Sequence, residues 1–256
     1  MSAISALTKK IKSRYQRMAV QLFARRPHRM QNREPLISFT FDDFPRSALH
    51  IAGASLQRHG VVGTYYTSLG LMGQKAPTGE MFLQEDLATL LAAGHELACH
   101  TFAHCHSYET TPDVFEQSVL ENQRAMRSLH PAVRFQSLSY PISWPRVETK
   151  RRCARYFLGC RAGGQTYNTG TIDLNYLSAF FLEQSRDNLD AIKQVIDANR
   201  RAGGWLIFAT HDVCADPTHY GCVPELFDAV LRHSIESGAR ILPVSSALQA
   251  IGAGAK

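Results

Sequence analysis

The sequence has 256 residues, of which 45% are hydrophobic and 20% are charged; this is typical of a globular chain and excludes a disordered or fibrous protein. No apolar run approaches the roughly 18 residues of a membrane-spanning helix. The formal net charge of +6 would suggest nucleic-acid binding, but residues 1–34 contain nine Lys/Arg and one acid, which leaves the remainder close to neutral. We therefore predict no nucleic-acid partner.

In chain order, apolar runs after residue 34 predict strands at 37–41, 62–66, 96–98, 137–140, 156–160, 176–182, 205–210 and 240–244. Periodic segments closed by Gly or opened by capping residues predict helices at 47–59, 84–93, 111–129, 147–155, 188–201 and 224–237. Buried strands that alternate with helices predict an α/β fold with a parallel sheet. Their number favours a closed barrel, with a doubly wound open sheet as the alternative.

We predict two regions, a basic N-terminal arm at 1–34 and a barrel domain at 35–256. The arm is interpreted as a solvated tail, with peripheral contact to an anionic membrane surface as the alternative. It does not resemble a signal peptide, since its apolar stretch is short and interrupted by Gln21. The six cysteines form no C-x-x-C pair. We therefore expect reduced thiols and a cytoplasmic protein, with membrane association open.

Three polar clusters follow predicted strands, where a barrel or a doubly wound sheet places its site. They are Asp42-Asp43, the pair His100 and His104, and His211 followed by Asp212. Asp42 and Asp43 are also compatible with an ordinary strand-end turn. A histidine after a buried strand is compatible with a core residue, although at the site face it can protonate a leaving group.

The spacing of His100 and His104 predicts two imidazoles on one side of a helical turn, where both can bind one metal ion. Asp43 would complete a site with two nitrogens and one oxygen. Such a site suits one divalent ion; we predict Zn²⁺, with Co²⁺, Ni²⁺ and Fe²⁺ as alternatives. Asp42 would then accept a proton from water. The alternative for the histidines is a pair on a surface loop.

Together these segments resemble the polysaccharide deacetylase (NodB-type) domain, carbohydrate esterase family 4. The resemblance rests on residues 40–43 (Thr-Phe-Asp-Asp), 100–104 (His-Thr-Phe-Ala-His), 139–142 (Ser-Tyr-Pro-Ile) and the apolar run before His211. It covers residues 35 to about 248. It implies a distorted (β/α)7 barrel and metal-dependent removal of N- or O-acetyl groups from a saccharide.

The resemblance also implies residue roles. Asp42 is the expected base, and His211 is the expected general acid. The expected metal ligands are Asp43, His100 and His104. The N–H of Ile142 is expected to stabilise the oxyanion, and the expected substrate-binding residues are Tyr140, Pro141, Ile142 and Trp144.

The sequence departs from the family pattern at Ser139, where the family usually has an Arg that pairs with the base. Arg161 and Arg146 are candidates to replace that cation. Phe44 stands after the two acids, where the family usually has Gly. We consider Phe44, Tyr140 and Trp144 as residues that could stack on a sugar ring.

The leading hypothesis is therefore a metal-dependent saccharide deacetylase, an enzyme that acts on carbon–nitrogen bonds other than peptide bonds. Its expected partner is an acetylated saccharide. The alternatives are a metal-dependent amidase for a non-sugar amide and a non-catalytic carbohydrate-binding relative.

Overall fold

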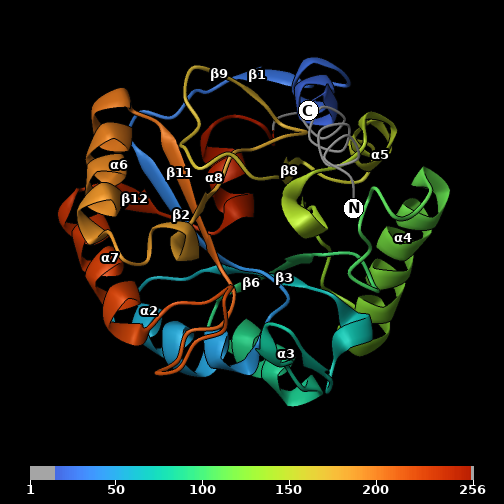
Figure 1. Cartoon of the computed structure of the whole chain (residues 1–256), viewed down its shortest axis with the longest axis horizontal. Coiled ribbons are helices and arrows are strands. Elements are labelled where there is room, and N and C mark those ends of the chain that lie inside the picture. Colours follow the sequence, from blue (N-terminus) through green and yellow to red (C-terminus); the bar gives the residue numbers. More distant parts are fainter. Residues whose placement is uncertain (1–14, 255–256) are drawn as a thin grey trace, which may run out of the picture.

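The computed structural model describes residues 15–254, and its centre is a parallel sheet that curls into a barrel (Figure 1). The sheet order is β10-β11-β2-β3-β6-β7-β8, with β12 paired to the first part of β2. A parallel bridge between Arg161 and Leu177 joins β8 to the chain that enters β10, which completes the ring. The strands are β2 (Leu36–Phe41), β3 (Thr64–Thr67), β6 (Glu96–Cys99), β7 (Ser137–Ser139), β8 (Gly159–Arg161), β10 (Phe180–Phe181), β11 (Trp205–Thr210) and β12 (Arg240–Ile241). The predicted single-domain α/β barrel is confirmed.

Helices cover the outer face of the barrel (Figure 1). They are α2 (Ala54–Arg58), which continues a π-type turn at Ala48–Gly53, α3 (Gln84–Ala92), α4 (Pro112–Leu129), α5 (Val147–Cys153), α6 (Leu189–Ala202) and α7 (Pro224–Glu236). Side-chain caps start two of them, because Thr111 accepts a hydrogen bond from the Val114 N–H and Asn188 accepts one from the Ala191 N–H. The predicted helices are therefore present, with ends that differ by a few residues.

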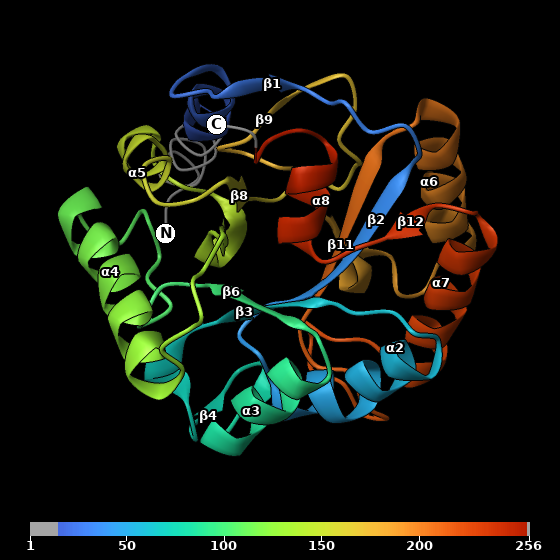
Figure 2. The same cartoon turned by 180° about the vertical axis from the view of Figure 1, so that it is seen from behind.

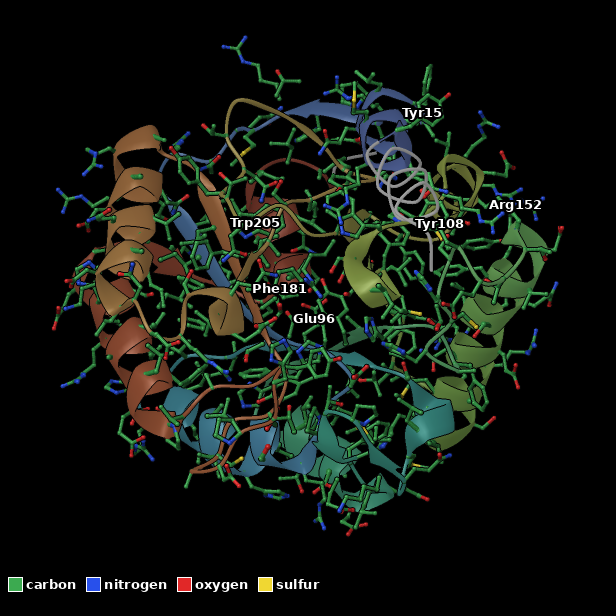
Figure 3. All side chains as sticks on the ribbon, in the orientation of Figure 1. Tyr15, Glu96, Tyr108, Arg152, Phe181 and Trp205 are labelled. Carbon is green, nitrogen blue, oxygen red and sulfur yellow. The ribbon has the colours of Figure 1, made fainter. Side chains whose placement is uncertain are left out.

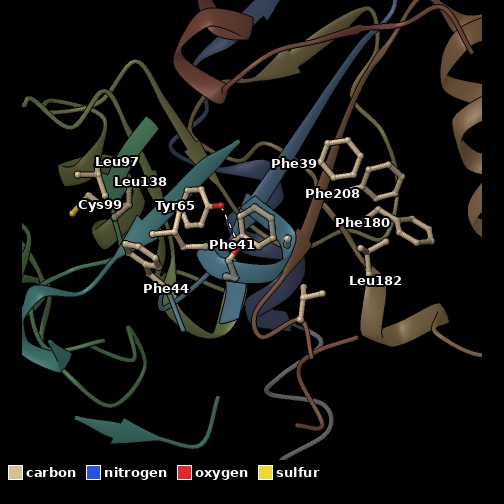
Figure 4. Close-up of a cluster of buried hydrophobic side chains, with 14 of the residues drawn as sticks. Phe39, Phe41, Phe44, Tyr65, Leu97, Cys99, Leu138, Phe180, Leu182 and Phe208 are labelled. Carbon is tan, nitrogen blue, oxygen red and sulfur yellow. Dashed lines mark hydrogen bonds between the residues drawn. The ribbon is translucent and has the colours of Figure 1, made fainter. Parts of the chain in front are cut away.

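The two longest barrel strands, β2 and β11, are buried along their whole length. Alternate side chains of β2 face opposite sides of the sheet. Phe39 packs against Phe208, with ring centroids 5.4 Å apart (Figure 4). It also packs against Phe227 of α7, at a centroid distance of 5.5 Å. On the other face Thr40 donates a hydrogen bond to the Phe208 carbonyl. The outer core is thus aromatic, and polar side chains enter the barrel.

A helix that the sequence did not predict, α8 (Val244–Ala250), closes one end of the barrel. The Val244 N–H donates to Thr64 at the start of β3, and the Ser245 N–H donates to Glu96 at the start of β6. Figure 2 shows α8 between β8 and β2, and Figure 3 shows Glu96 toward the middle of the molecule. Because α8 covers the amino ends of the strands, the carboxyl ends remain for a site.

Three predicted strands differ from the observed ones. The strand predicted at 156–160 is Gly159–Arg161, because residues 156–158 belong to the turn before it. Of residues 176–182 only Phe180–Phe181 pair with β11. Before them, Leu177 donates a backbone hydrogen bond to Cys160 and accepts one from the Ala162 N–H, which forms the bridge to β8. The strand predicted at 240–244 stops at Ile241, because Pro243 precedes the first residue of α8. Two short antiparallel pairs were not predicted, because no apolar run marks them. They are β1 (Pro27–Arg29) with β9 (Thr171–Asp173), and β4 (Lys75–Ala76) with β5 (Gly79–Glu80).

The described part of the predicted N-terminal arm, residues 15–34, packs on the barrel. Residues 15–22 are helical, and Val20 is completely buried. The Arg26 guanidinium donates to the carbonyls of Ala154, Phe157 and Leu158. Residues 15–34 therefore do not form the solvated tail that the sequence suggested, while residues 1–14 lie outside the described part. Within residues 15–254, every helix is too short or too polar to span a membrane.

Candidate metal and catalytic site

A cavity of about 900 Å³ opens at the carboxyl ends of the barrel strands. Its lining includes Asp42, Asp43, His100, His104 and His211. These side chains come from segments that follow β2, β6 and β11. The three polar clusters, in which Asp42 and His211 are 169 positions apart in the sequence, thus meet in one place, as the rule for parallel barrels predicts.

The predicted metal ligands converge on one point. Oδ1 of Asp43 lies 3.5 Å from Nε2 of His100 and 3.3 Å from Nε2 of His104. The three ligand atoms lie within 4.8 Å of one another. Asp43 Oδ1 is buried and has no hydrogen-bond partner in the described structure, whereas Asp43 Oδ2 accepts a hydrogen bond of 2.9 Å from Thr78. A buried carboxylate oxygen left in this way between two imidazoles fits a divalent cation.

The two histidines do not lie on a helical turn, and the sequence interpretation was wrong on this point. Residues 100–106 form an irregular loop in which Thr101 and His104 have φ angles of 62° and 49°. The Ser118 hydroxyl of α4 accepts hydrogen bonds from two N–H groups of this loop, and Thr101 Oγ1 accepts one from the Cys105 N–H. Side-chain hydrogen bonds from α4 and from within the loop, rather than helical spacing, bring the imidazoles together.

Burial sets the protonation state of His100. The ring is almost fully buried, which lowers its pKa to about 4. Its Nδ1 lies 2.8 Å from the Ser139 carbonyl oxygen, which can only accept a hydrogen bond. We assign the proton to Nδ1 on this basis. The lone pair of Nε2 then faces Asp43, which is the orientation of a metal-binding imidazole.

Arg161 lies where a cation can pair with Asp42, the partner that the sequence lacks at Ser139. It is the last residue of β8, is buried, and contacts both carboxylate oxygens of Asp42 and the Ser139 hydroxyl. Tyr66 and Phe181 pack on its guanidinium, with ring centroids 5.1 and 5.3 Å away (Figure 3 labels Phe181). Of the two candidates that the sequence offered, Arg161 is therefore the one that reaches Asp42.

The other candidate, Arg146, lies elsewhere and donates to the Tyr108 carbonyl.

Burial by itself raises the pKa of Asp42, but the charge of Arg161, helped by His100 and His211, outweighs burial and holds that pKa below its ordinary value of 3.8. Asp42 is consequently a carboxylate at neutral pH.

His211 lines the cavity, but Asp212 does not orient it. Nδ1 of His211 lies 3.1 Å from the Tyr220 carbonyl oxygen. Asp212 instead accepts hydrogen bonds from the N–H and the hydroxyl of Thr218, at 2.7 and 2.6 Å. Asp212 therefore shapes the loop that contains Thr218 and does not bond to His211.

Glu183 is a cavity residue that the sequence analysis missed. It follows β10, lines the same cavity as His211, and has a buried Oε2 without a hydrogen-bond partner in the described structure. Burial raises its pKa to about 7, against the lowering effect of His211. The available signal was an acid directly after a predicted strand, the same signal that singled out Asp42.

The predicted substrate-binding residues divide into two groups. Tyr140 is buried and its hydroxyl donates to the Asn175 carbonyl, and Pro141 is buried next to it. Phe44 is also fully buried, stacked on Phe82. Since none of these three side chains lines the cavity, Tyr140 and Phe44 are not sugar-stacking surfaces.

Ile142 and Trp144 do line the cavity. Ile142 has a φ angle of 60° and is 56% exposed. The Arg17 guanidinium lies over one face of the Trp144 ring, 4.8 Å from the ring centroid. A sugar ring that stacks on that face would have to displace Arg17.

A sequence profile of the polysaccharide deacetylase family matches residues 29–156, half of the chain. The protein belongs to the polysaccharide deacetylase family. The match contains Asp42, Asp43, His100 and His104, whereas Arg161, Glu183 and His211 lie beyond it. This membership confirms the resemblance to the NodB-type domain. A search of curated protein sequences finds no match.

Solved structures of polysaccharide deacetylases show the same fold at low sequence identity. A chitin deacetylase from the fungus Colletotrichum lindemuthianum has a TM-score of 0.60 and 14% identity, over 85% of this chain and 89% of that one. The peptidoglycan deacetylase PdaC from Bacillus subtilis gives 0.55 and 16%, over 85% and 92%. A pseudoenzyme of carbohydrate esterase family 4 from Bacillus anthracis gives 0.59 and 11%, over 86% and 68%. The distorted (β/α)7 barrel of this family is therefore the fold of the chain.

Proposed function

We propose that the protein is a metal-dependent deacetylase that hydrolyses an N-acetyl or O-acetyl group of a saccharide. The observation that carries the proposal is the buried, unpartnered Oδ1 of Asp43 between two imidazole nitrogens. A second carboxylate, Asp42, lies beside it in the same cavity. One carboxylate is thus available to hold an ion while the other is available for proton transfer.

Asp43, His100 and His104 would hold the divalent ion. The ligand set of two imidazoles and one carboxylate suits Zn²⁺, with Co²⁺, Ni²⁺ and Fe²⁺ as alternatives. Bound there, the ion would polarise the acetyl carbonyl and acidify a water molecule. Hydrogen bonds on the side away from the ion would orient two of the three ligands: Thr78 donates to Oδ2 of Asp43, and Nδ1 of His100 bonds to the Ser139 carbonyl.

Asp42 would accept the proton of the attacking water. The charge of Arg161 keeps Asp42 deprotonated at neutral pH, and the contact with the Ser139 hydroxyl helps to fix the guanidinium. A base with a low pKa is weak in bulk water, but here it needs to act only on water whose own pKa is lowered.

His211 would donate a proton to the departing amine or alcohol. Its Nδ1 faces the Tyr220 carbonyl, so that a proton on Nδ1 leaves Nε2 for the reacting group. The N–H of Ile142, at the turn that follows Pro141, would stabilise the developing oxyanion.

Two observations favour this function over its alternatives. The cavity of about 900 Å³ is large for a small amide and suits one or more sugar rings. The non-catalytic alternative rested on the cation absent at Ser139, and Arg161 provides that cation. Cytoplasmic location and contact with a membrane surface stay predictions from the sequence.

The test combines metal analysis with acetate release. Wild-type protein loaded with Zn²⁺ is expected to bind one ion per chain and to release acetate from N-acetylated chito-oligosaccharides or from an acetyl ester. Asp42→Asn should retain the ion and lose turnover by about 10²–10⁴-fold, the usual contribution of a proton acceptor. Asp113→Asn, a control on the exposed side of α4, should change neither. A chain whose metal content is unchanged by Asp43→Ala, or an Asp42→Asn variant with full activity, would contradict the proposal.

A further inference from the structure

The N-terminal helix, residues 15–22, forms part of the wall of the cavity. Arg17 and Gln21 line the same cavity as Asp43 and the histidines. The family match begins only at residue 29, so that this wall lies outside the part of the chain that identifies the family. The helix is therefore a feature of this chain that the proposed chemistry does not by itself require.

This helix is firmly attached to the barrel. The Lys150 ammonium of α5 is fully buried and donates hydrogen bonds to the carbonyls of Val20 and Phe23, at 2.6 and 3.0 Å. It also forms an ion pair with Asp173 at 2.6 Å. A cation at the carboxyl end of a helix satisfies its free carbonyls and its dipole. Arg17, one turn before Val20, is consequently held at the cavity.

Arg17 is the cavity cation without an ionic partner among residues 15–254. Its guanidinium lies over the Trp144 ring, and it has no ion pair with any described carboxylate. Of the carboxyl groups that line the cavity, Asp42 pairs with the buried Arg161 and Asp43 faces the two imidazoles, whereas Oε2 of Glu183 has no hydrogen-bond partner among the described residues. An exposed cation that is oriented by an aromatic ring and not neutralised is suited to bind an anion.

We propose that Arg17 and Trp144 form a subsite for an anionic group, a carboxylate or a phosphate, on the acetylated saccharide. The proposal rests on the proposed function and names the substrate class of that site. A guanidinium binds either group through two parallel hydrogen bonds. Its stacking on Trp144 restricts it to a plane and lowers the entropy lost on binding. A neutral sugar can accept a hydrogen bond from the guanidinium but cannot form an ion pair with it.

Trp144 provides a direct probe of binding. The chain has two tryptophans, and the other, Trp205, is fully buried with its ring N–H bonded to Ser38. A ligand-induced change in tryptophan fluorescence therefore reports on Trp144. Zn²⁺-loaded Asp42→Asn protein would be titrated with three probes, so that turnover does not interfere. The probes are N,N′,N″,N‴-tetraacetylchitotetraose, a tetrasaccharide of alternating glucuronic acid and N-acetylglucosamine, and N-acetylglucosamine 1-phosphate.

The anionic probe that the site accepts should bind about tenfold more tightly than the neutral one, as expected for a charge-assisted pair. Arg17→Gln should remove this preference without changing the affinity for the neutral probe. Arg17→Lys should restore part of it, because the charge is kept. Arg25→Gln, an exposed arginine just beyond the helix and absent from the cavity lining, is the matched control and should bind as the parent protein does. Comparison of the titrations with the glucuronic acid tetrasaccharide and with N-acetylglucosamine 1-phosphate shows whether the subsite binds a carboxylate or a phosphate.

Equal affinity for neutral and anionic probes, or an equal loss for both in Arg17→Gln, would overturn the subsite. The proposed function fails in a different way. If wild-type protein releases no acetate from any probe while the Arg17-dependent preference persists, the deacetylase assignment is wrong and the anion subsite stands. If acetate is released with no preference that depends on Arg17, the deacetylase stands and the subsite is wrong.

Discussion

Replacement of Arg161 by Met should destabilise the protein and raise the pKa of Asp42. The side chain is buried with Asp42, contacts both of its carboxylate oxygens, and is enclosed by Tyr66 and Phe181. Loss of the cation leaves a buried carboxylate without a partner, for which the cost is about 3–5 kcal/mol. With an m-value of about 3 kcal/mol/M, the urea midpoint should fall by roughly 1–1.7 M.

The pH dependence of stability should change sign. In the wild type the pKa of Asp42 is lower in the folded than in the unfolded chain, so that the pair stabilises the fold above the ordinary carboxyl pKa. This stability is lost as the pH falls through the folded pKa. In Arg161→Met burial becomes the dominant influence on Asp42 and raises its pKa, against the smaller lowering effects of His100 and His211. The free energy of unfolding should then decrease as the pH rises from about 4 to 7.

A double-mutant cycle tests the reasoning. Asp42→Asn combined with Arg161→Met removes the unpaired charge and should recover about 2 kcal/mol or more relative to Arg161→Met alone. Stability is measured by urea denaturation followed by circular dichroism, at several pH values and without added metal. If the double variant is as unstable as Arg161→Met, the loss comes from packing of the guanidinium, and the electrostatic argument for this pair is refuted.

Three further predictions follow from single contacts. His100→Asn should reduce bound Zn²⁺ from one ion per chain to none, because one of three ligands is lost; retention of one tightly bound ion by mass spectrometry under native conditions would contradict the assigned ligands. In the wild type the raised pKa of Glu183 should make the free energy of unfolding fall as the pH rises from about 4.5 to 7, because the neutral carboxyl favours the folded state. Glu183→Gln should remove this decline. An unchanged pH profile of thermal unfolding would show that this carboxyl is not responsible. Lys150→Met should cost about 3 kcal/mol, the lower end for a broken buried ion pair, because Asp173 loses its ionic partner but keeps hydrogen bonds from the N–H groups of Arg26 and Asn175. Asp173→Asn in the same chain should return part of that loss in urea unfolding, and no recovery would refute the ion-pair argument.

Local patterns in the sequence identified most of the fold and part of the site. Apolar runs such as 205–210 become strands because they bury both faces, and Thr111 and Asn188 start helices through their own side chains. The acids at 42–43 and the two histidines were placed together because parallel strands end at one face of a barrel. Their convergence in the structure supports that inference, although the histidine loop reaches it without helical geometry.

Only the tertiary structure shows which residues far apart in the chain contact one another. Arg161 reaches Asp42 across 119 positions, and Lys150 holds the N-terminal helix from 130 positions away. Tyr140 turned inward, away from the cavity, because the face that a side chain occupies in an irregular segment depends on its packing partners. Periodicity records which face of an element is apolar. It carries no information on which buried cation meets which carboxylate, since that depends on the curvature of the sheet and the order of its strands.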